Sequence, residues 1–415
     1  MPELAKLASV DLWHHETAEE RPADVPRIRF RRAADVESSA LAHYDLIVYN
    51  LGNHLPFHNE IFHLAQRVPG VIVLHDFVMH HFFAGQYLDD LKRPDFYVEA
   101  MRRLYGERGR AVAAAAISGK KPPIWETDEV IDFPMFEDVV RGSYGVITHS
   151  NFLAEEVRRV FDGPVCKIPL ACELPRAARN GSKQELGIPA DRLLIVTVGH
   201  VNPNKRVHSV LAALATLGEM RKKIIYAVLG PYPNEYHKRL QELVRTGRLN
   251  ESVRFLGYVP DDVLHAYIQQ ADLCVNLRFP AFEGASGSIV EELWYGKPVI
   301  VTDTGFYSEL PDDAVWKITP DREAQDLPIA LRELLENPDA RGRLSRNALE
   351  FAQSQFQVSH YVQELLKFSW EVRRNKPVLE FADRLGKELG ELGVTTNMDA
   401  ATSIADRAYR LLFGS

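Results

Sequence analysis

Short apolar runs, separated by longer amphipathic stretches, recur along the chain. Each run is four to seven residues long and ends in a polar or glycine-rich turn. Because strands buried on both faces of a parallel sheet show continuous apolar runs, the pattern predicts an α/β fold with parallel sheets. A longer amphipathic pattern at 347–373 predicts a helix. The predicted strands are Val10–Trp13, Tyr44–Tyr49, Gly70–Leu74, Gly145–Thr148, Leu193–Val198, Ile224–Gly230, Val253–Gly257, Ala271–Val275 and Pro298–Val301.

Polar loops follow the second and third of these runs. The first spans residues 50–58 and the second begins with His75 and Asp76. Ligands of parallel α/β sheets bind at the carboxyl ends of the strands, so these loops are candidate site segments. A lone histidine is more often a hydrogen-bonded structural residue, but His75 ends a predicted strand at that edge.

Residues 279–305 combine a glycine-rich loop, a helix and a buried strand. The start of such a helix has unpaired N–H groups and a partial positive charge, which favour a phosphate or diphosphate. Glu283 lies before the helix and Glu291 eight positions later. Carboxylates bind sugar hydroxyls through two acceptor oxygens, so Glu283 is a candidate for the sugar and Glu291 for the ribose. The alternative is a surface helix with two solvated glutamates.

This stretch resembles the nucleotide-sugar-binding segment of retaining glycosyltransferases of the GT-B fold, family 4. The family pattern is approximately EGFGLPVLEAMACGLPVV; both glutamates are kept, and residues 285–288 depart from it slightly. The resemblance implies two Rossmann-like domains facing across a cleft. It extends to His75-Asp76, whose histidine would lie beside the donor sugar, and to the turn at 199–207, where the family has Gly-Arg and later Lys-Gly. Here His200 replaces the arginine and Arg206 the glycine, while Lys205 is kept.

The resemblance assigns site residues by position. The implied catalytic residues are His75, Lys205 and Glu283. The acceptor side comprises Gly52, Asn53, His54 and Asp76. The backbone at 257–259 would meet the nucleobase. The donor-binding set is Gly199, His200, Lys205, Arg206, Tyr258, Val259, Glu283, Gly284, Ala285, Ser286, Gly287, Ser288 and Glu291.

Composition narrows the class of protein. A chain of 415 residues exceeds what one core usually holds, and 46% hydrophobic with 26% charged residues is typical of a soluble globular protein. The formal net charge of −8 argues against a general nucleic-acid binder. The three cysteines (Cys166, Cys172, Cys274) show no metal-ligand spacing and indicate a reducing compartment. With neither a signal peptide nor a membrane span in the pattern, we expect a bacterial cytoplasmic protein.

Residues 92–121 carry eight lysines and arginines against three acids, a local balance of +5. A basic helical face can contact anionic lipid, which predicts at most weak peripheral contact with the inner face of the membrane. A solvated face is the alternative.

The predicted domains are an N-terminal acceptor-side domain at 1–175 and a nucleotide-sugar-binding domain at 186–350. A crossover helix at 351–374 and a helical appendage at 375–415 follow. The family's N-terminal domain normally opens with a strand and a glycine-containing loop, and this sequence begins after that point. We therefore expect an N-terminal domain without its first strand, either shortened, working without that strand, or no longer catalytic.

The functional prediction is a metal-independent hexosyltransferase that uses a UDP- or GDP-sugar and retains the anomeric configuration. The acceptor would be a saccharide or a lipid-linked saccharide in cell-envelope or exopolysaccharide synthesis, and no cofactor is expected. No two aspartates are spaced D-x-D, so Lys205, Arg206 and the helix start would neutralise the leaving diphosphate. Alternatives are a catalytically silent nucleotide-sugar-binding module or partner subunit, and a GT-B sugar epimerase.

Overall fold

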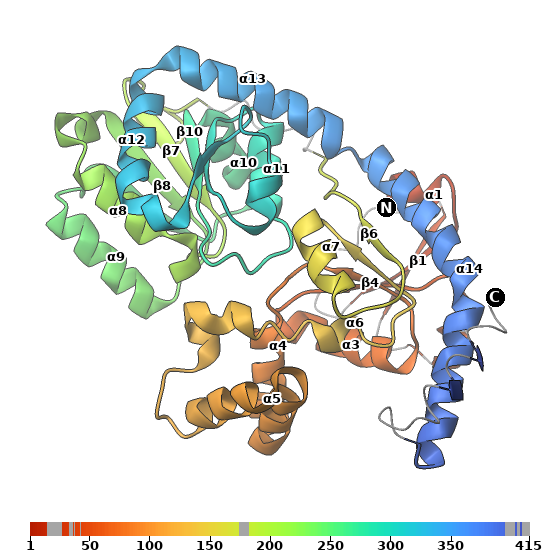
Figure 1. The fold of residues 1–415 in the computed structure, drawn as a ribbon. Helices are drawn as coiled ribbons and strands as arrows, with labels where there is room; N and C mark the ends of the chain where they lie inside the picture. The colour runs from red at the N-terminus through yellow and green to blue at the C-terminus, as the bar shows by residue number, and fades with distance from the viewer. Residues whose placement is uncertain are drawn as a thin grey trace.

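The structure is a computed structural model that describes residues 1–14, 27–32, 36, 38–41, 43–173, 182–394, 403–404 and 407–408. In this part of the chain, two α/β domains lie side by side, and a long helical segment runs from one to the other (Figure 1). Both sheets are parallel, as the apolar runs predict.

The C-terminal domain is built on a six-stranded sheet in the order β12-β11-β10-β7-β8-β9. The chain enters at the centre of the sheet with β7, adds β8 and β9 on one side, and then crosses back to place β10 on the other side of β7. This reversal is a topological switch point, where the loops on either side diverge and leave room for a ligand. The strands are β7 Leu193–Val198, β8 Ile224–Leu229, β9 Val253–Gly257, β10 Leu273–Asn276, β11 Val299–Thr302 and β12 Trp316–Ile318.

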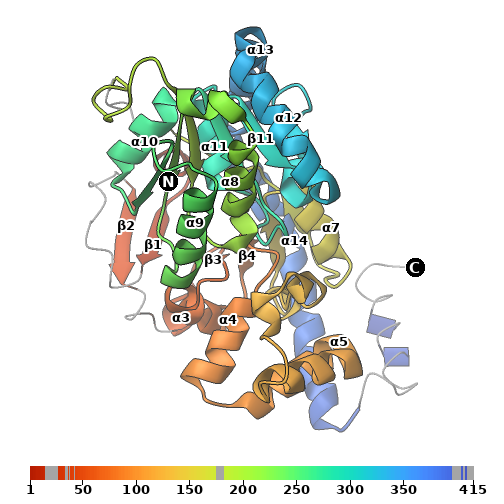
Figure 2. The ribbon, with the colours of Figure 1, turned by 90° about the vertical axis from the view of Figure 1, so that its left-hand side faces the viewer.

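Helices cover both faces of this sheet (Figures 1 and 2). Alternate strand residues point to opposite faces, so Ile195 packs with one helical layer and Val196 with the other. The first layer is α8 Val207–Ala215, α9 Asn234–Thr246 and α12 Glu323–Glu336; the second is α10 Asp261–Gln270, α11 Gly287–Trp294 and α13 Pro338–Gln355.

The N-terminal domain has a four-stranded sheet in the order β3-β4-β5-β6. One face packs against helices of the same domain, and α4 and α5 extend from it as a separate helical layer (Figure 1). The strands are β3 Val48–Leu51, β4 Val71–Leu74, β5 Gly145–Thr148 and β6 Val165–Lys167. The helices are α3 Leu55–Arg67, α4 His80–Ala84, α5 Pro94–Ile117, α6 Glu137–Val140 and α7 Asn151–Arg158.

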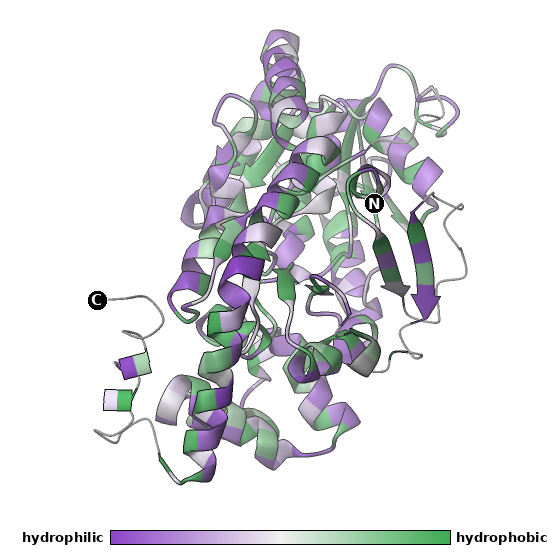
Figure 3. Ribbon diagram, turned by 90° about the vertical axis from the view of Figure 1, so that its right-hand side faces the viewer, coloured by the Kyte–Doolittle hydropathy of each residue, from purple (hydrophilic) through white to green (hydrophobic). Residues whose placement is uncertain are grey.

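The other face of this sheet is covered by α14 (Val358–Glu391), which follows α13 after a break at Phe356 and Gln357. Figure 3 shows hydrophilic and hydrophobic residues alternating along this helix. Its apolar residues Leu365, Phe368 and Val372 pack on Val71, Val73 and Ile147 of the sheet. The end of the chain therefore completes the core of the first domain.

Most predicted strands are confirmed, but the run Tyr44–Tyr49 is only partly right. The strand begins at Val48, where pairing with Val71 sets the register. Tyr44 instead donates a hydrogen bond to Asp11, and Asp45 pairs with Arg373. These polar contacts engage only the first two residues of the run, and the ladder with β4 begins at its end, where Val71 N–H donates to Ile47 O (2.8 Å).

The first predicted strand is confirmed as β1 (Val10–His14), which pairs in parallel with β2 (Ile28–Arg32). Within the described residues these two strands form their own sheet and do not extend the four-stranded one. Short helices α1 (Pro2–Ala5) and α2 (Ser38–Leu41) flank them. The prediction of a missing first strand remains a prediction.

The basic stretch at 92–121 is largely neutralised by local ion pairs. Each of its five arginines lies within ion-pair distance of an aspartate or glutamate. Exposed pairs of this kind contribute little to stability, but they reduce the charge offered to a membrane. None of the helices in the described part of the chain is long and apolar enough to span a bilayer.

Candidate active site at the domain junction

The candidate site lies at the carboxyl ends of β7 and β10, on both sides of the switch point. The loop after β7 carries Gly199 to Arg206, and the loop after β10 carries Arg278 to Ser288. The two loops are joined by a hydrogen bond from Phe279 N to Asn204 O (2.8 Å). The sheet topology therefore brings together the two segments that the sequence predicts for the donor.

Glu283 lies at the centre of a buried polar cluster. Its Oε1 accepts hydrogen bonds from Arg278 Nε (2.7 Å) and Tyr307 Oη (2.7 Å). Burial alone would raise the pKa of Glu283, but the charges of Arg278 and Lys205 and the Tyr307 hydrogen bond hold that pKa below its ordinary value. Glu283 is therefore ionised at neutral pH and can accept hydroxyl hydrogen bonds.

Lys205 is buried beside this cluster, and its Nζ donates to the carbonyl of Val198. Burial and the neighbouring Arg278 lower its pKa well below the ordinary value, opposed by Glu283 and Glu292. Gly199 makes room for it: φ at Gly199 is +103°, and a Cβ there would collide with Lys205 Nζ. An arriving anion would favour the charged form of this lysine.

Glu291 and Glu292 point in different directions from α11. Glu291 is half-buried, and burial raises its pKa, with His265 of α10 opposing this shift and Asp261 adding to it. Glu292 is fully buried, and its Oε2 accepts from Asn276 Nδ2 (2.9 Å), while its Oε1 has no hydrogen-bond partner. Burial raises the pKa of Glu292 to about 7. The Glu291 contact with ribose remains a prediction.

Arg206 has a local role that its sequence position did not suggest. It adopts φ +55°, in the left-handed region that favours glycine, which explains why a glycine suits this position. Its guanidinium makes three hydrogen bonds with the carboxylate of Glu323 at 2.8–3.2 Å. His200 keeps an exposed side chain, and partial desolvation together with the nearby charge of Lys205 lowers its pKa. Neither residue takes part in the Glu283 cluster through a hydrogen bond among the described contacts.

The predicted glycine-rich loop leads directly into α11, which begins at Gly287. Its serines are linked, with Ser286 Oγ 3.0 Å from Ser288 Oγ, and Ser288 accepts from Asn276 Nδ2 (3.0 Å). Ala285 packs on the second helical layer of the domain. Tyr258 and Val259 follow β9 on the same edge of the sheet, and the Tyr258 side chain is 79% exposed.

Gly284 joins the two domains. Its N–H donates to the carbonyl of His75 (2.8 Å), and Val78 N–H donates to the carbonyl of Phe282 (2.9 Å), so Asp76 pairs with Glu283 as an isolated antiparallel bridge. A Cβ at Gly284 would lie 3.1 Å from the His75 carbonyl and would collide with Leu153. The predicted residues of both domains thus meet at this junction.

Three of the four acceptor-side residues also meet there. Asp76 Oδ2 accepts from Asn53 N–H (2.8 Å), and a Cβ at Gly52 would approach that same oxygen to 2.8 Å. Burial raises the pKa of Asp76 to about 7, with the Asn53 amide opposing this shift and Glu283 adding to it. His54 precedes α3 as its N-cap residue.

Sequence reasoning missed four residues of the site: His149, Arg278, Glu292 and Tyr307. It placed Asn50 in a candidate loop but gave that residue no role. Arg278 follows a predicted strand, which is a signal that could have been used. Tyr307 and His149 reach their partners Glu283 and His75 over 24 and 74 residues of sequence, and no local pattern carries such a contact.

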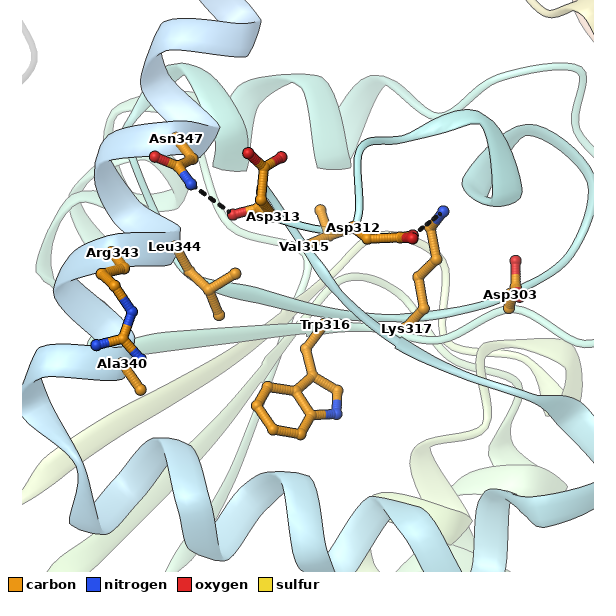
Figure 4. A pocket seen from close by; sticks show the side chains of 10 residues that line it. All are labelled: Asp303, Asp312, Asp313, Val315, Trp316, Lys317, Ala340, Arg343, Leu344 and Asn347. Carbon is orange, nitrogen blue, oxygen red and sulfur yellow. Dashed lines mark hydrogen bonds and ion pairs between the residues drawn. The ribbon is translucent and has the colours of Figure 1, made fainter.

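A separate hollow of about 630 Å³ lies beside the edge strand β12. Figure 4 shows the Asp312–Lys317 ion pair and the hydrogen bond from the Asn347 side chain to the Asp313 carbonyl on one side of this strand. The Trp316 indole lies on the other side. None of the predicted donor residues lines it. The described residues contain no group of three or more metal-ligating side chains.

The fold is that of the GT-B glycosyltransferases. It matches sucrose-phosphate synthase from Thermosynechococcus elongatus with a TM-score of 0.61 at 16% identity, covering 89% of this chain and 90% of that one. It also matches Anabaena Alr3699/HepE, solved with UDP-glucose, with a TM-score of 0.55 at 19% identity, covering 83% and 85%. Similarity at this level of identity establishes the fold alone.

Sequence comparison places the family signal in the C-terminal domain, where residues 178–351 match the family model "Glycosyl transferases group 1". A D-inositol 3-phosphate glycosyltransferase of Saccharomonospora viridis is 25% identical over 233 residues, which cover 52% of this chain and 53% of that protein. The O-antigen chain mannosyltransferase B of Escherichia coli is 28% identical over 179 residues, covering 41% and 46%. The chain thus spans about half the length of these relatives, and the matches support the glycosyltransferase superfamily.

Proposed function

We propose that this protein is a glycosyltransferase that transfers a hexose from a UDP- or GDP-sugar to a saccharide or lipid-linked acceptor, with retention. The observation that carries the proposal is the buried cluster of Arg278, Glu283 and Lys205 at the switch point, beside the start of α11. It combines cations for a diphosphate with an ionised carboxylate for sugar hydroxyls. The relatives include an O-antigen chain mannosyltransferase, which favours a role in cell-envelope or exopolysaccharide synthesis.

In this proposal, Lys205 and Arg278 stabilise the negative charge that develops as the diphosphate leaves. The sequence lacks the arginine expected at His200, and Arg278 supplies a second cation from the neighbouring loop. The N–H groups at the start of α11 add to the same field. Glu283 is paired with Arg278 in the described structure, and a bound diphosphate would compete for that arginine and free the carboxylate for the sugar.

The reaction we propose proceeds on one face of the sugar. The bond from C1 to the diphosphate oxygen breaks, the acceptor oxygen bonds to C1, and the acceptor hydroxyl proton passes to the departing phosphate. This route needs no covalent carboxylate intermediate and no metal ion. The protein's contribution is to orient the donor and to stabilise developing charge.

A donor screen tests the proposal directly. The full chain is incubated with UDP- and GDP-hexoses and a panel of saccharide and lipid-linked acceptors, and products are identified by mass spectrometry and their anomeric configuration by NMR. We expect one donor to give a retained glycoside, and the Lys205→Met variant to give little or none. Calorimetric binding of a sugar nucleotide without transfer or hydrolysis would favour the silent binding module instead.

A further inference from the structure

Two histidines from different strands of the N-terminal sheet contact each other at the junction. His149 follows β5 and is 3% exposed, and His75 follows β4. His149 Nε2 lies 3.3 Å from His75 Nδ1, with ring centroids 5.1 Å apart and ring planes inclined by 36°. The positions of their ring protons follow from the partners of the four nitrogens.

The first proton is fixed by a carbonyl. His149 Nδ1 lies 2.8 Å from the carbonyl oxygen of Ile168, which only accepts hydrogen bonds, so Nδ1 carries a proton. Burial lowers the pKa of His149, so the ring is neutral at pH 7 and its Nε2 has a lone pair. That nitrogen can only accept.

The second proton therefore lies on His75 Nδ1, which donates to His149. Burial, with the nearby His149 and His58, lowers the pKa of His75 to about 3, so this ring is neutral as well. Two neutral imidazoles carry two ring protons, and both are now placed. His75 Nε2 consequently has a lone pair.

Asn50 is the neighbour of this lone pair. Asn50 Oδ1 is placed 3.1 Å from His75 Nε2, an arrangement that a lone pair on Nε2 turns round, because the amide then presents its NH2 group to that nitrogen. The oxygen and NH2 group of an amide exchange places on a half-turn, so Asn50 can donate to Nε2. The His75 carbonyl accepts a hydrogen bond from Gly284 N–H, which places His75 close to Glu283. A ligand hydroxyl bound at this junction could therefore replace Asn50 as the donor to His75 Nε2.

We propose that His149 is a positioning residue that holds His75 in the tautomer protonated on Nδ1, so that His75 Nε2 accepts a hydrogen bond from a hydroxyl of the donor sugar. The sugar assignment rests on the proposed function, whereas the tautomer does not. In this arrangement Glu283 of the C-terminal domain and His75 of the N-terminal domain are both hydrogen-bond acceptors for hydroxyl groups. In a histidine that faces a ligand, the protonation state of the nitrogen toward the ligand is commonly set by the hydrogen bond that the other ring nitrogen makes.

The tautomer can be measured without any assay of activity. In the full chain labelled with ¹⁵N-histidine, long-range ¹H–¹⁵N NMR distinguishes a protonated from an unprotonated ring nitrogen, and the His75→Gln spectrum assigns the His75 signals. We expect wild-type His75 to be protonated on Nδ1 at pH 7. Protonation on Nε2 in the wild type would overturn the proposal, whether or not any variant folds.

Three variants test the role of His149. His149→Phe keeps a ring but removes the acceptor, and we expect at least half of His75 to move its proton to Nε2. His149→Gln can donate to Ile168 and accept from His75, so it should retain the wild-type tautomer. Tyr361→Phe is the matched control, because Tyr361 packs near His149 with ring centroids 6.4 Å apart and the substitution keeps that packing. An unchanged tautomer in His149→Phe would overturn the positioning role.

Binding measurements then test the sugar contact. With the sugar nucleotide found in the donor screen, we expect His149→Phe to weaken binding about three- to tenfold, the scale of one hydrogen bond. Binding of the corresponding sugar-free nucleoside diphosphate should not change. Equal losses for both ligands, or none, would overturn the sugar contact while the tautomer result stands. If wild type bound no sugar nucleotide, the proposed function would fail, and the sugar contact with it.

Discussion

At the scale of single residues, adjacent positions in this protein have very different surroundings. Lys205 and Arg206 are neighbours, yet Lys205 is buried beside Glu283 and Glu292, whereas Arg206 is held by Glu323. Glu291 and Glu292 differ in the same way, with one half-buried and the other fully buried. Each pair therefore places two neighbouring side chains of the same charge in different environments.

For the first pair we predict opposite effects on turnover and stability. Lys205→Met should lower kcat about a hundredfold or more, because a charge aimed at the leaving group is lost. Arg206→Met should leave kcat within about tenfold, but it removes the partner of buried Glu323 and should lower the free energy of unfolding. Steady-state kinetics and urea unfolding of both variants check this. Similar losses of kcat in the two variants would contradict the assignment of Lys205.

For Glu292 we predict that replacement by glutamine gives a pH-dependent gain in stability. The pKa of Glu292 is raised to about 7 in the folded state, above its unfolded value, so the folded state binds more protons and its stability falls as pH rises from about 4.5 to 7. Glu292→Gln removes this loss. The variant's free energy of unfolding relative to wild type should rise by about 1.4 kcal/mol per pH unit over that interval.

Urea unfolding at pH 5.0 and 6.5 measures the difference. Glu333→Gln, the same substitution on an exposed site of α12, serves as the control for the change from carboxylate to amide. If the free energies of unfolding of Glu292→Gln and wild type differed by the same amount at both pH values, the assignment of a raised pKa to Glu292 would be wrong.

At the scale of elements, the start of α7 is completed by the other domain. Glu309 at the end of a short 3₁₀ helix (Gly305–Glu309) accepts from the N–H groups of Asn151 (2.9 Å) and Phe152 (2.7 Å) and from Asn151 Nδ2 (2.9 Å). The Ser150 hydroxyl caps the same helix and accepts from Leu153 N–H (3.3 Å). Sequence could identify the serine, because it is local, but not the carboxylate 158 residues away.

We predict that Glu309→Ala loosens the contact between the domains. Its loss leaves two first-turn amides without acceptors and removes a negative charge from a helix start. Amide exchange in residues 150–154 should accelerate, and the radius of gyration in solution scattering should increase. Asp312→Ala, which alters an exposed acid in the following turn, should change neither. Exchange at the wild-type rate in Glu309→Ala would show that this contact does not hold the domains together.

The same contrast between local and distant contacts explains what sequence could predict. Strands buried on both faces, such as β4 and β8, are apolar throughout and were predicted correctly. The run at Tyr44–Tyr49 was placed too early, since its register depends on pairing with β4 and its first residues on contacts with Asp11 and Arg373. Glu283 and Lys205 could be predicted from their local motifs. The roles of Arg278, Tyr307 and His149 depend on contacts that form only in the folded protein.

At the scale of the whole molecule, the two domains are coupled by α14. Phe368 and Val372 lie on β5 so closely that a Cβ at Gly145 would approach them to 3.0 and 2.8 Å. The N-terminal sheet therefore has a complete core only when the last long helix is in place. By contrast, the C-terminal sheet is covered on both faces by its own helices. A substitution that disrupts the packing of α14 should consequently lower the stability of the N-terminal domain.

The last prediction uses this asymmetry. Phe368→Ala should destabilise the N-terminal domain by about 3–5 kcal/mol, the usual cost of truncating a buried phenylalanine, and should speed amide exchange in β4 and β5. Exchange in β7 and β8 should remain near the wild-type rate. Trp370→Ala is the matched control, since it removes a larger side chain from the same helix at a position that is 68% exposed. If Phe368→Ala accelerated exchange equally in both sheets, the domains would unfold as one unit; if it accelerated neither, α14 would not be part of the N-terminal core.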